Sequence, residues 1–206
     1  MKALVISGSR NPEGRTSLVI KALCKGIEGS GGETEVLYLP SMDIELCRQC
    51  NSDGWGICMD EDKCINDDDD FPEIVEKIDN ADVTVFVTPV YFGDLSESMK
   101  AFLDRLRRVK ARNPREPLDP KKPMPGPFNN DEGPIAMGLC YAGGSGNGTT
   151  LCCMNLERIL MFCGFDVVNM MPVRRQNLDN KIIIAELIGK WLATCPSSSE
   201  CELEPI

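Results

Sequence analysis

The sequence contains no histidine among its 206 residues. Imidazole is a frequent general acid or base and a common ligand of zinc and iron, so its absence excludes His-based acid–base catalysis, Ser-His triads and every histidine-containing metal site. No apolar stretch approaches the ~20 residues that a membrane-spanning helix needs, and the first residues lack the basic segment and cleavage site of a secretion signal. We therefore expect a soluble, cytoplasmic protein that needs a cofactor for most enzymatic chemistry.

A basic excess is also missing, because the formal net charge is −10. This balance argues against a nucleic-acid partner, whose phosphates attract clustered lysine and arginine. The imbalance is local, since residues 43–70 hold ten acidic and two basic side chains, whereas residues 105–122 hold eight basic and two acidic ones. Residues 109–133 are rich in proline, which excludes a long helix or a central strand. We expect this insertion to reach the acidic segment of a neighbouring subunit.

Short apolar runs alternate with amphipathic stretches along the rest of the chain. Strands are expected at residues 2–6, 33–39, 82–87, 134–140 and 164–168. Helices are expected around residues 18–23, 71–75, 96–108, 149–163 and 180–192. Five strands that alternate with helices, without an internal repeat, predict an α/β fold: a flavodoxin-like, doubly wound, five-stranded parallel sheet between two helical layers. One domain is expected over residues 1–195, followed by a flexible tail at residues 196–206.

The first predicted strand leads into a polar loop and then a helix. Unpaired amides and the partial positive charge at a helix N-terminus favour a bound anion, and the hydroxyl and guanidinium groups collected there suit a phosphate. The candidate phosphate-binding residues are Ser9, Arg10, Arg15, Thr16 and Ser17. The loop has neither the GxGxxG spacing of dinucleotide-binding folds nor the GK[ST] ending of P-loop NTPases. A serine-rich helix cap without a ligand is the alternative.

Two more loops are expected at the same edge of the sheet, where parallel strands end and ligands bind at the topological switch point. The loop after the third strand offers Pro89, Val90, Tyr91, Phe92 and Gly93. The loop after the fourth strand offers Tyr141, Gly143, Gly144 and Gly146, whose small residues let the backbone approach a flat ligand. The alternative for Tyr91 and Phe92 is a pair of ordinary surface aromatics.

The loop motifs together resemble those of the NADPH-dependent FMN reductase family. Gly8-Ser9-Arg10 with Arg15-Thr16-Ser17 resembles the family's first loop, and the Pro89–Gly93 run with Ser96 resembles its second flavin loop. The resemblance implies that the first loop binds the FMN phosphate and the other two enclose the isoalloxazine ring. It also implies NAD(P)H as the electron donor, a small molecule or protein such as ferredoxin as a further donor or acceptor, and a homodimer or homotetramer. No side chain is expected to be catalytic.

Four of the eleven cysteines fall in one segment without periodicity at residues 41–66, which we call the cysteine loop. Thiolates are soft ligands, so Cys47, Cys50, Cys58 and Cys64 suit either a tetrahedral zinc or an iron–sulfur cluster. The segment resembles that of the iron–sulfur flavoproteins, a branch of the same family, which implies a [4Fe-4S] cluster. The branch usually places its third cysteine where this chain has Asp53, so unmetallated thiols remain an alternative.

The remaining cysteines considered are expected to be small core residues, because they lie in apolar surroundings. These are Cys24, Cys140, Cys152, Cys153 and Cys163. The four aspartates at residues 67–70 precede a predicted helix and are expected to favour its N-terminus rather than bind metal. The function expected from the whole sequence is an FMN-dependent oxidoreductase. A flavin electron carrier without substrate turnover and a zinc-stabilised interaction module without flavin are the alternatives.

Overall fold

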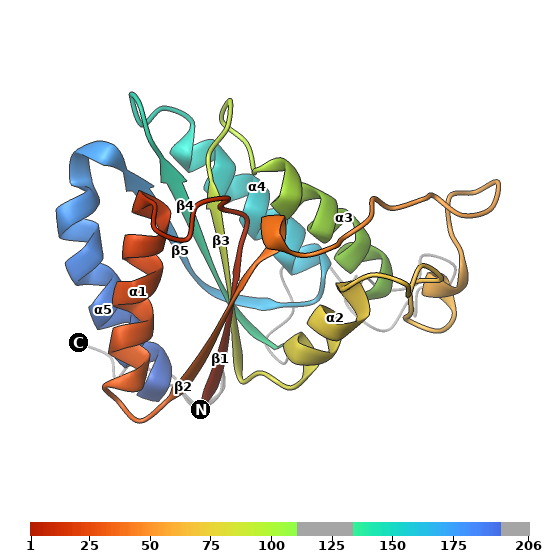
Figure 1. The fold of residues 1–206 in the computed structure, drawn as a ribbon, viewed down its shortest axis with the longest axis horizontal. Helices are drawn as coiled ribbons and strands as arrows, with labels where there is room; N and C mark the ends of the chain where they lie inside the picture. The colour runs from red at the N-terminus through yellow and green to blue at the C-terminus, as the bar shows by residue number, and fades with distance from the viewer. Residues whose placement is uncertain (111–133, 195–206) are drawn as a thin grey trace, which may run out of the picture.

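The computed structural model describes residues 1–110 and 134–194. Five parallel strands form one sheet in the order β2-β1-β3-β4-β5 (Figure 1). The strands are β1 (Lys2–Ser7), β2 (Glu33–Tyr38), β3 (Val83–Pro89), β4 (Ile135–Ala142) and β5 (Asp166–Arg174). Every expected strand overlaps one of them, and the order is that of the flavodoxin-like fold, so the predicted fold class is confirmed.

Five α-helices of the described residues cover the sheet in two layers (Figure 1). They are α1 (Arg15–Glu28), α2 (Phe71–Asp79), α3 (Glu97–Lys110), α4 (Thr149–Phe162) and α5 (Leu178–Thr194). One layer is formed by α1 and α5 and the other by α2, α3 and α4. Most of the predicted insertion and tail lies outside the described residues. Within the described part of the chain, no helix is long and apolar enough to cross a membrane.

The two cores follow from the alternation of side chains along buried strands. In β3, Val83, Val85 and Val87 face the core under α1 and α5, whereas Phe86 faces the core under α2, α3 and α4. All seven residues of β3 are buried, as expected for a central parallel strand covered on both faces. The amphipathic helix predicted around residues 96–108 is confirmed, because four apolar side chains of α3 are fully buried: Met99, Phe102, Leu103 and Leu106.

The order of the strands places the switch point between β1 and β3. The chain leaves β1 for α1 in one layer and leaves β3 for α3 in the other, although the two strands are hydrogen-bonded neighbours. Connections that diverge in this way leave a crevice at the carboxyl ends of the strands. The predicted ligand-binding loops all begin at this edge.

The helices of one layer pack closely through two glycines. A Cβ added to Gly26 of α1 would lie 2.1 Å from the carbonyl oxygen of Glu186, and one added to Gly189 of α5 would lie 2.2 Å from that of Leu23. Main-chain atoms cannot rotate away as a side chain can. The backbones of α1 and α5 therefore touch at a distance that only glycine permits.

We expect Gly189→Ala to destabilise the protein. Alanine improves helix propensity by about 1 kcal/mol, but overpacking costs about 1–3 kcal/mol, and the clash with a carbonyl oxygen leaves no room for relaxation. The free energy of unfolding, measured by denaturant titration, should fall by about 1–2 kcal/mol. Leu187→Ala on the exposed side of α5 is the control and should change it by less than about 0.5 kcal/mol. An unchanged or more stable Gly189→Ala would contradict the close contact.

Candidate functional site

The three predicted loops meet at the carboxyl edge of the sheet. The amide of Gly8 donates to the carbonyl of Val87 at 2.8 Å, and the amide of Val90 donates to the carbonyl of Tyr141 at 2.8 Å. A Cβ on Gly148 would lie 2.5 Å from Cα of Gly93, so the second and third loops touch through their backbones. The structure thus gathers the loops into one rim, as the switch-point argument predicts.

The first loop leaves the N-terminus of α1 open. Gly14 occupies the N-cap position and has no side chain to bond the free amides of the first turn. The hydroxyl of Ser17 donates to the carbonyl of Asn11 at 3.0 Å and accepts from the phenol of Tyr38 at 3.2 Å. Ser9, Thr16 and Ser17 are buried, whereas Arg10 and Arg15 are exposed. The arrangement combines free amides, hydroxyls and positive charge, which suits a phosphate group.

Arg10 is already engaged by a carboxylate. Its guanidinium forms an ion pair with Glu97 in the first turn of α3. Both side chains are more than half exposed, so the pair contributes little to stability and can open for another anion. Glu97 was not among the predicted site residues.

The second loop holds Phe92 in an unusual conformation. Tyr91 and Asp94 exchange two backbone hydrogen bonds of 3.0 Å, and between them Phe92 and Gly93 have φ angles of +53° and +84°. Positive φ at both central residues is typical of a type I′ turn. Glycine adopts it freely, but a bulky residue does not. Phe92 is nevertheless fully exposed, so the strained turn presents an aromatic ring to solvent.

Side-chain hydroxyl groups bind the start of α3 to the second and first loops. The amide of Ser96 donates to the hydroxyl of Thr88 at 3.0 Å, and the hydroxyl of Ser98 donates to the carbonyl of Gly8 at 3.2 Å. A Cβ on Gly8 would lie 2.3 Å from the hydroxyl oxygen of Ser96, so the first loop must have glycine there. Thr88 was missed by the sequence analysis, although a threonine at the end of an apolar strand is the signal that could have identified it.

The third loop combines exposed and constrained glycines. Gly143 and Gly144 are exposed, whereas Gly146 is buried with φ at +77° and its carbonyl accepts from the hydroxyl of Thr149 at 2.7 Å. The ring of Tyr141 packs in the core under α1 and α5. Its hydroxyl is buried and has no hydrogen-bond partner among the described residues. The aromatic face of Tyr141 is therefore not presented at the rim.

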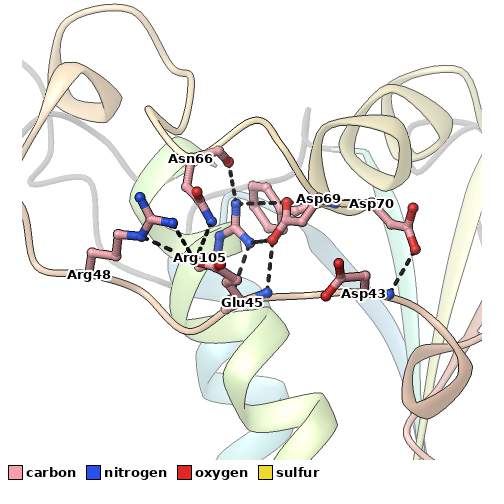
Figure 2. A network of polar contacts seen from close by, with 8 residues as sticks. Asp43, Glu45, Arg48, Asn66, Asp69, Asp70 and Arg105 are labelled. Atoms are coloured by element: carbon pink, nitrogen blue, oxygen red, sulfur yellow. Dashed lines mark hydrogen bonds and ion pairs between the residues drawn. The ribbon is translucent and has the colours of Figure 1, made fainter.

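A buried arginine attaches the cysteine loop to α3 (Figure 2). Arg105 forms an ion pair with Asp69, and the two side chains are 1% and 3% exposed. The Arg105 guanidinium also donates to the carbonyls of Asn66 at 2.7 Å and Glu45 at 3.2 Å, and it lies 4.0 Å from the ring centroid of Phe71. Because Glu45 precedes the four cysteines and Asn66 follows them, one side chain holds both ends of the segment that contains them.

The contacts of this region refine two interpretations of the sequence. Arg105 belongs to the basic segment at residues 105–122, but it is buried and its charge is neutralised by Asp69. The prediction that the aspartate run favours the N-terminus of α2 is confirmed in part, because Asp69 accepts from the amide of Phe71, the first residue of α2, at 3.2 Å, whereas Asp70 at the N-cap makes no side-chain capping bond. Its carboxylate instead accepts from the amide of Asp43 at 2.8 Å (Figure 2), and that of Asp69 accepts from the amide of Glu45 at 2.8 Å. These carboxylates mainly fasten the cysteine loop.

The ion pair also determines the protonation of Asp69. Burial opposes ionisation of this carboxyl, but the hydrogen bond from Arg105 and those from two backbone amides outweigh it and lower its pKa below 3.8. The same pair raises the pKa of Arg105 despite its burial, and Cys64 contributes to that rise. The loop is therefore held by a carboxylate that stays ionised well into the acidic range.

All four cysteines of the loop line one small cavity. Cys47, Cys50, Cys58 and Cys64 are partly buried, and Arg105 and Arg108 line the same cavity from α3. Among the described residues, no three cysteine or carboxylate side chains are arranged so that they could hold a metal ion as they stand. The structure brings the predicted ligands to one place without closing them into a metal site.

The other cysteines behave as predicted. Each has 8% or less of its surface exposed, and the five lie in the two apolar cores: Cys24, Cys140, Cys152, Cys153 and Cys163. Burial raises the pKa of the Cys163 thiol to about 12. A neutral thiol in such surroundings packs as a small apolar group. Their role as core residues is confirmed.

Comparison with known proteins now identifies the family. A family profile described as "NADPH-dependent FMN reductase" matches residues 1–178. The chain belongs to this family. An iron–sulfur flavoprotein of Methanocaldococcus jannaschii is 39% identical over 111 residues, which are 53% of this chain and 54% of that protein. The chain spans about half the length of the curated relatives it matches.

Solved structures agree with this family fold. The alignment with a flavone reductase includes 100% of this chain and 66% of that protein. Its TM-score is 0.68 and the sequence identity is 18%. The NAD(P)H:quinone oxidoreductase from Methanothermobacter marburgensis has a TM-score of 0.64 and 18% identity over 93% of this chain and 96% of its own. At these identities the likeness shows the fold alone.

We expect Asp69→Asn to destabilise the protein strongly at neutral pH. Removing one partner of a buried ion pair leaves an uncompensated charge, which costs about 3–5 kcal/mol. The folded-state pKa of Asp69 is lowered, so the stability it contributes is present above about pH 4 and is lost as the pH falls through the folded value. The difference in unfolding free energy between wild type and Asp69→Asn should therefore shrink in that acidic range.

The control is Asp79→Asn, which removes the exposed partner of Lys110. This surface pair should contribute about 0–1 kcal/mol. Denaturant titrations of the three proteins from pH 7 to pH 3 would measure both effects. Two results would contradict the role assigned to the buried pair. One is an equal loss of unfolding free energy in both variants, and the other is a difference between wild type and Asp69→Asn that does not change with pH.

Proposed function

We propose that this protein is an FMN-dependent oxidoreductase that takes electrons from NAD(P)H and also binds a [4Fe-4S] cluster in its cysteine loop. The observation that carries the proposal is the convergence of three loops at the switch point, beside a helix N-terminus without a side-chain cap. Membership of the NADPH-dependent FMN reductase family supports it. Bound FMN would supply hydride acceptance from a nicotinamide and onward electron transfer.

The first loop would bind the phosphate of FMN. The hydroxyls of Ser9, Thr16 and Ser17 lie at the N-terminus of α1, whose amides and partial charge attract an anion. Arg15 would add a positive charge from the first turn, and Arg10 would exchange Glu97 for the phosphate. These residues would orient the cofactor without taking part in the electron transfer.

The second and third loops would enclose the ring of FMN. Pro89 ends β3, and Val90, Tyr91, Phe92 and Gly93 form the turn that places an aromatic side chain in solvent. A planar ring stacked on Phe92 would explain why a strained turn presents an exposed aromatic residue. Gly143 and Gly144 face open space on the opposite side, Gly146 would hold the loop against Arg174 and Gln176, and Tyr141 would contribute its backbone.

The cysteine loop would hold the cluster. The four thiols line one cavity, and the buried Nε atoms of Arg105 and Arg108 have no hydrogen-bond partner among the described residues, which suits an anionic group bound there. The curated relatives named iron–sulfur flavoproteins support iron over zinc. Closing the four thiols around a metal centre would require the loop to adjust, because no three cysteine or carboxylate side chains among the described residues could hold a metal ion as they stand.

An anaerobic preparation tests the proposal directly. Absorbance spectra combined with FMN, iron, sulfide and zinc analysis should show one FMN and four iron and four sulfide per chain. Stopped-flow mixing with NADH or NADPH should then bleach the flavin. If neither NADH nor NADPH reduces the flavin, the protein is an electron carrier without substrate turnover. If it contains zinc but no FMN or iron, it is an interaction module. Either result would overturn the proposed enzyme.

We expect Thr16→Val to weaken FMN binding but not riboflavin binding. Valine keeps the shape and removes the buried hydroxyl, and a hydrogen bond to a charged group contributes about 1.5–3 kcal/mol, so the Kd for FMN should rise about 10–100-fold. Riboflavin lacks the phosphate and should bind both proteins equally in fluorescence titrations. Thr194→Val, at the far end of α5, is the control. A parallel loss of affinity for both flavins would place the phosphate elsewhere.

A further inference from the structure

Two arginines of α3 approach the cysteine cavity from the same side of the helix. Arg105 and Arg108 are three residues apart, which places them on one face. Both line the cavity, and the Nε atom of each is buried without a hydrogen-bond partner among the described residues. A buried N–H group without an acceptor is unfavourable, so two of them in one cavity favour a ligand there that accepts hydrogen bonds.

The rest of each guanidinium is fixed by the loop. The terminal nitrogens of Arg105 are bonded to Asp69 and to backbone carbonyls, so Nε is its only N–H position without a partner among the described residues, and the residue lines the cavity of the four cysteines. Arg108 lies with its guanidinium carbon 4.2 Å from the ring centroid of Trp55, which belongs to the cysteine loop. Stacking on an indole holds the arginine in place while its N–H groups stay available. Both side chains are thus oriented before any ligand binds.

The neighbouring basic residues of α3 serve other contacts. Arg107 pairs with Asp104, and Lys110 pairs with Asp79. Neither lines the cavity. Lys100, the fifth basic residue of α3, pairs with Asp104. The helix therefore presents two of its five basic side chains to the four cysteines, and the other three form ion pairs outside the cavity.

The charge of the loop explains why such residues are needed. Residues 43–70 carry a net charge of −8, and four thiolates around an iron–sulfur cluster add an anionic centre in both of its common redox states. Bringing more negative charge into a partly buried site is costly without compensation. Nearby positive charge and N–H donors to sulfur favour the more reduced, more negative state and so raise the reduction potential.

We propose that Arg105 and Arg108 are positioning residues that donate N–H groups to the sulfur atoms at the four-cysteine site and raise its reduction potential. This inference rests on the proposed function, since it concerns the cluster assigned there. Arg105 has a second task, because it also fastens the ends of the loop. Arg108 is therefore the residue whose substitution isolates the electrostatic effect.

The test compares three variants of the complete protein with FMN and cluster in place. Arg108→Gln removes the charge, Arg108→Lys keeps it, and Arg107→Gln is the control that removes the same charge from the neighbouring position. The midpoint potential of the cluster is measured by anaerobic dithionite titration followed by electron paramagnetic resonance. In Arg108→Gln, the ratio of reduced to oxidised cluster at a fixed potential should fall about tenfold, which corresponds to about 59 mV for one electron.

Arg108→Lys should recover at least half of that shift, and Arg107→Gln should move the potential less than Arg108→Gln. Loss of the cluster from Arg108→Gln but not from Arg108→Lys would also support the proposal. Equal shifts for Arg107→Gln and Arg108→Gln, or none in either, would overturn it while leaving the cluster intact. Wild-type protein without iron and sulfide would instead overturn the cluster assignment and, with it, this inference. Thermal melts and FMN content, expected to be unchanged, separate the effect from misfolding.

Discussion

The organisation of this protein depends on the buried contact between Arg105 and Asp69. An arginine that is 1% exposed must be neutralised and hydrogen-bonded, and the cysteine loop supplies the carboxylate and both carbonyls that do so. The loop has little regular structure of its own, so these bonds take the place of secondary structure. Without the contact, the segment of 18 residues that contains the four cysteines would lose the hydrogen bonds that tie both of its ends to α3.

The helix that carries Arg105 connects the two candidate sites. Near its N-terminus, Ser98 bonds to the first loop and Glu97 pairs with Arg10, while Arg108 lies at the cysteine cavity. Ten residues separate Ser98 from Arg108, or about 15 Å along a helix. A single rigid element, buried along one face against the sheet, therefore relates the rim of the three loops to the cysteine loop (Figure 1). The relation suits a protein that would pass electrons between two centres.

Local sequence patterns were sufficient to predict the fold and the loops of the rim. Apolar runs located all five strands, and glycine, proline and hydroxyl residues located the turns between them. The role of Arg105 could not be predicted in this way, because a buried ion pair joins residues 36 positions apart and an arginine in a basic stretch looks like surface. The bond between Asp70 and the amide of Asp43 was missed for the same reason, since the two residues are 27 positions apart. Trp55 gave no local signal of its contact with Arg108.

The measurement that tests the central claim most directly is X-ray diffraction at the iron absorption edge from crystals grown without oxygen. The account predicts an anomalous peak within the cavity lined by Cys47, Cys50, Cys58 and Cys64, on the side of α3 that presents Arg108. A crystal with ordered thiols and no iron in that cavity, or with iron bound elsewhere on the chain, would contradict it.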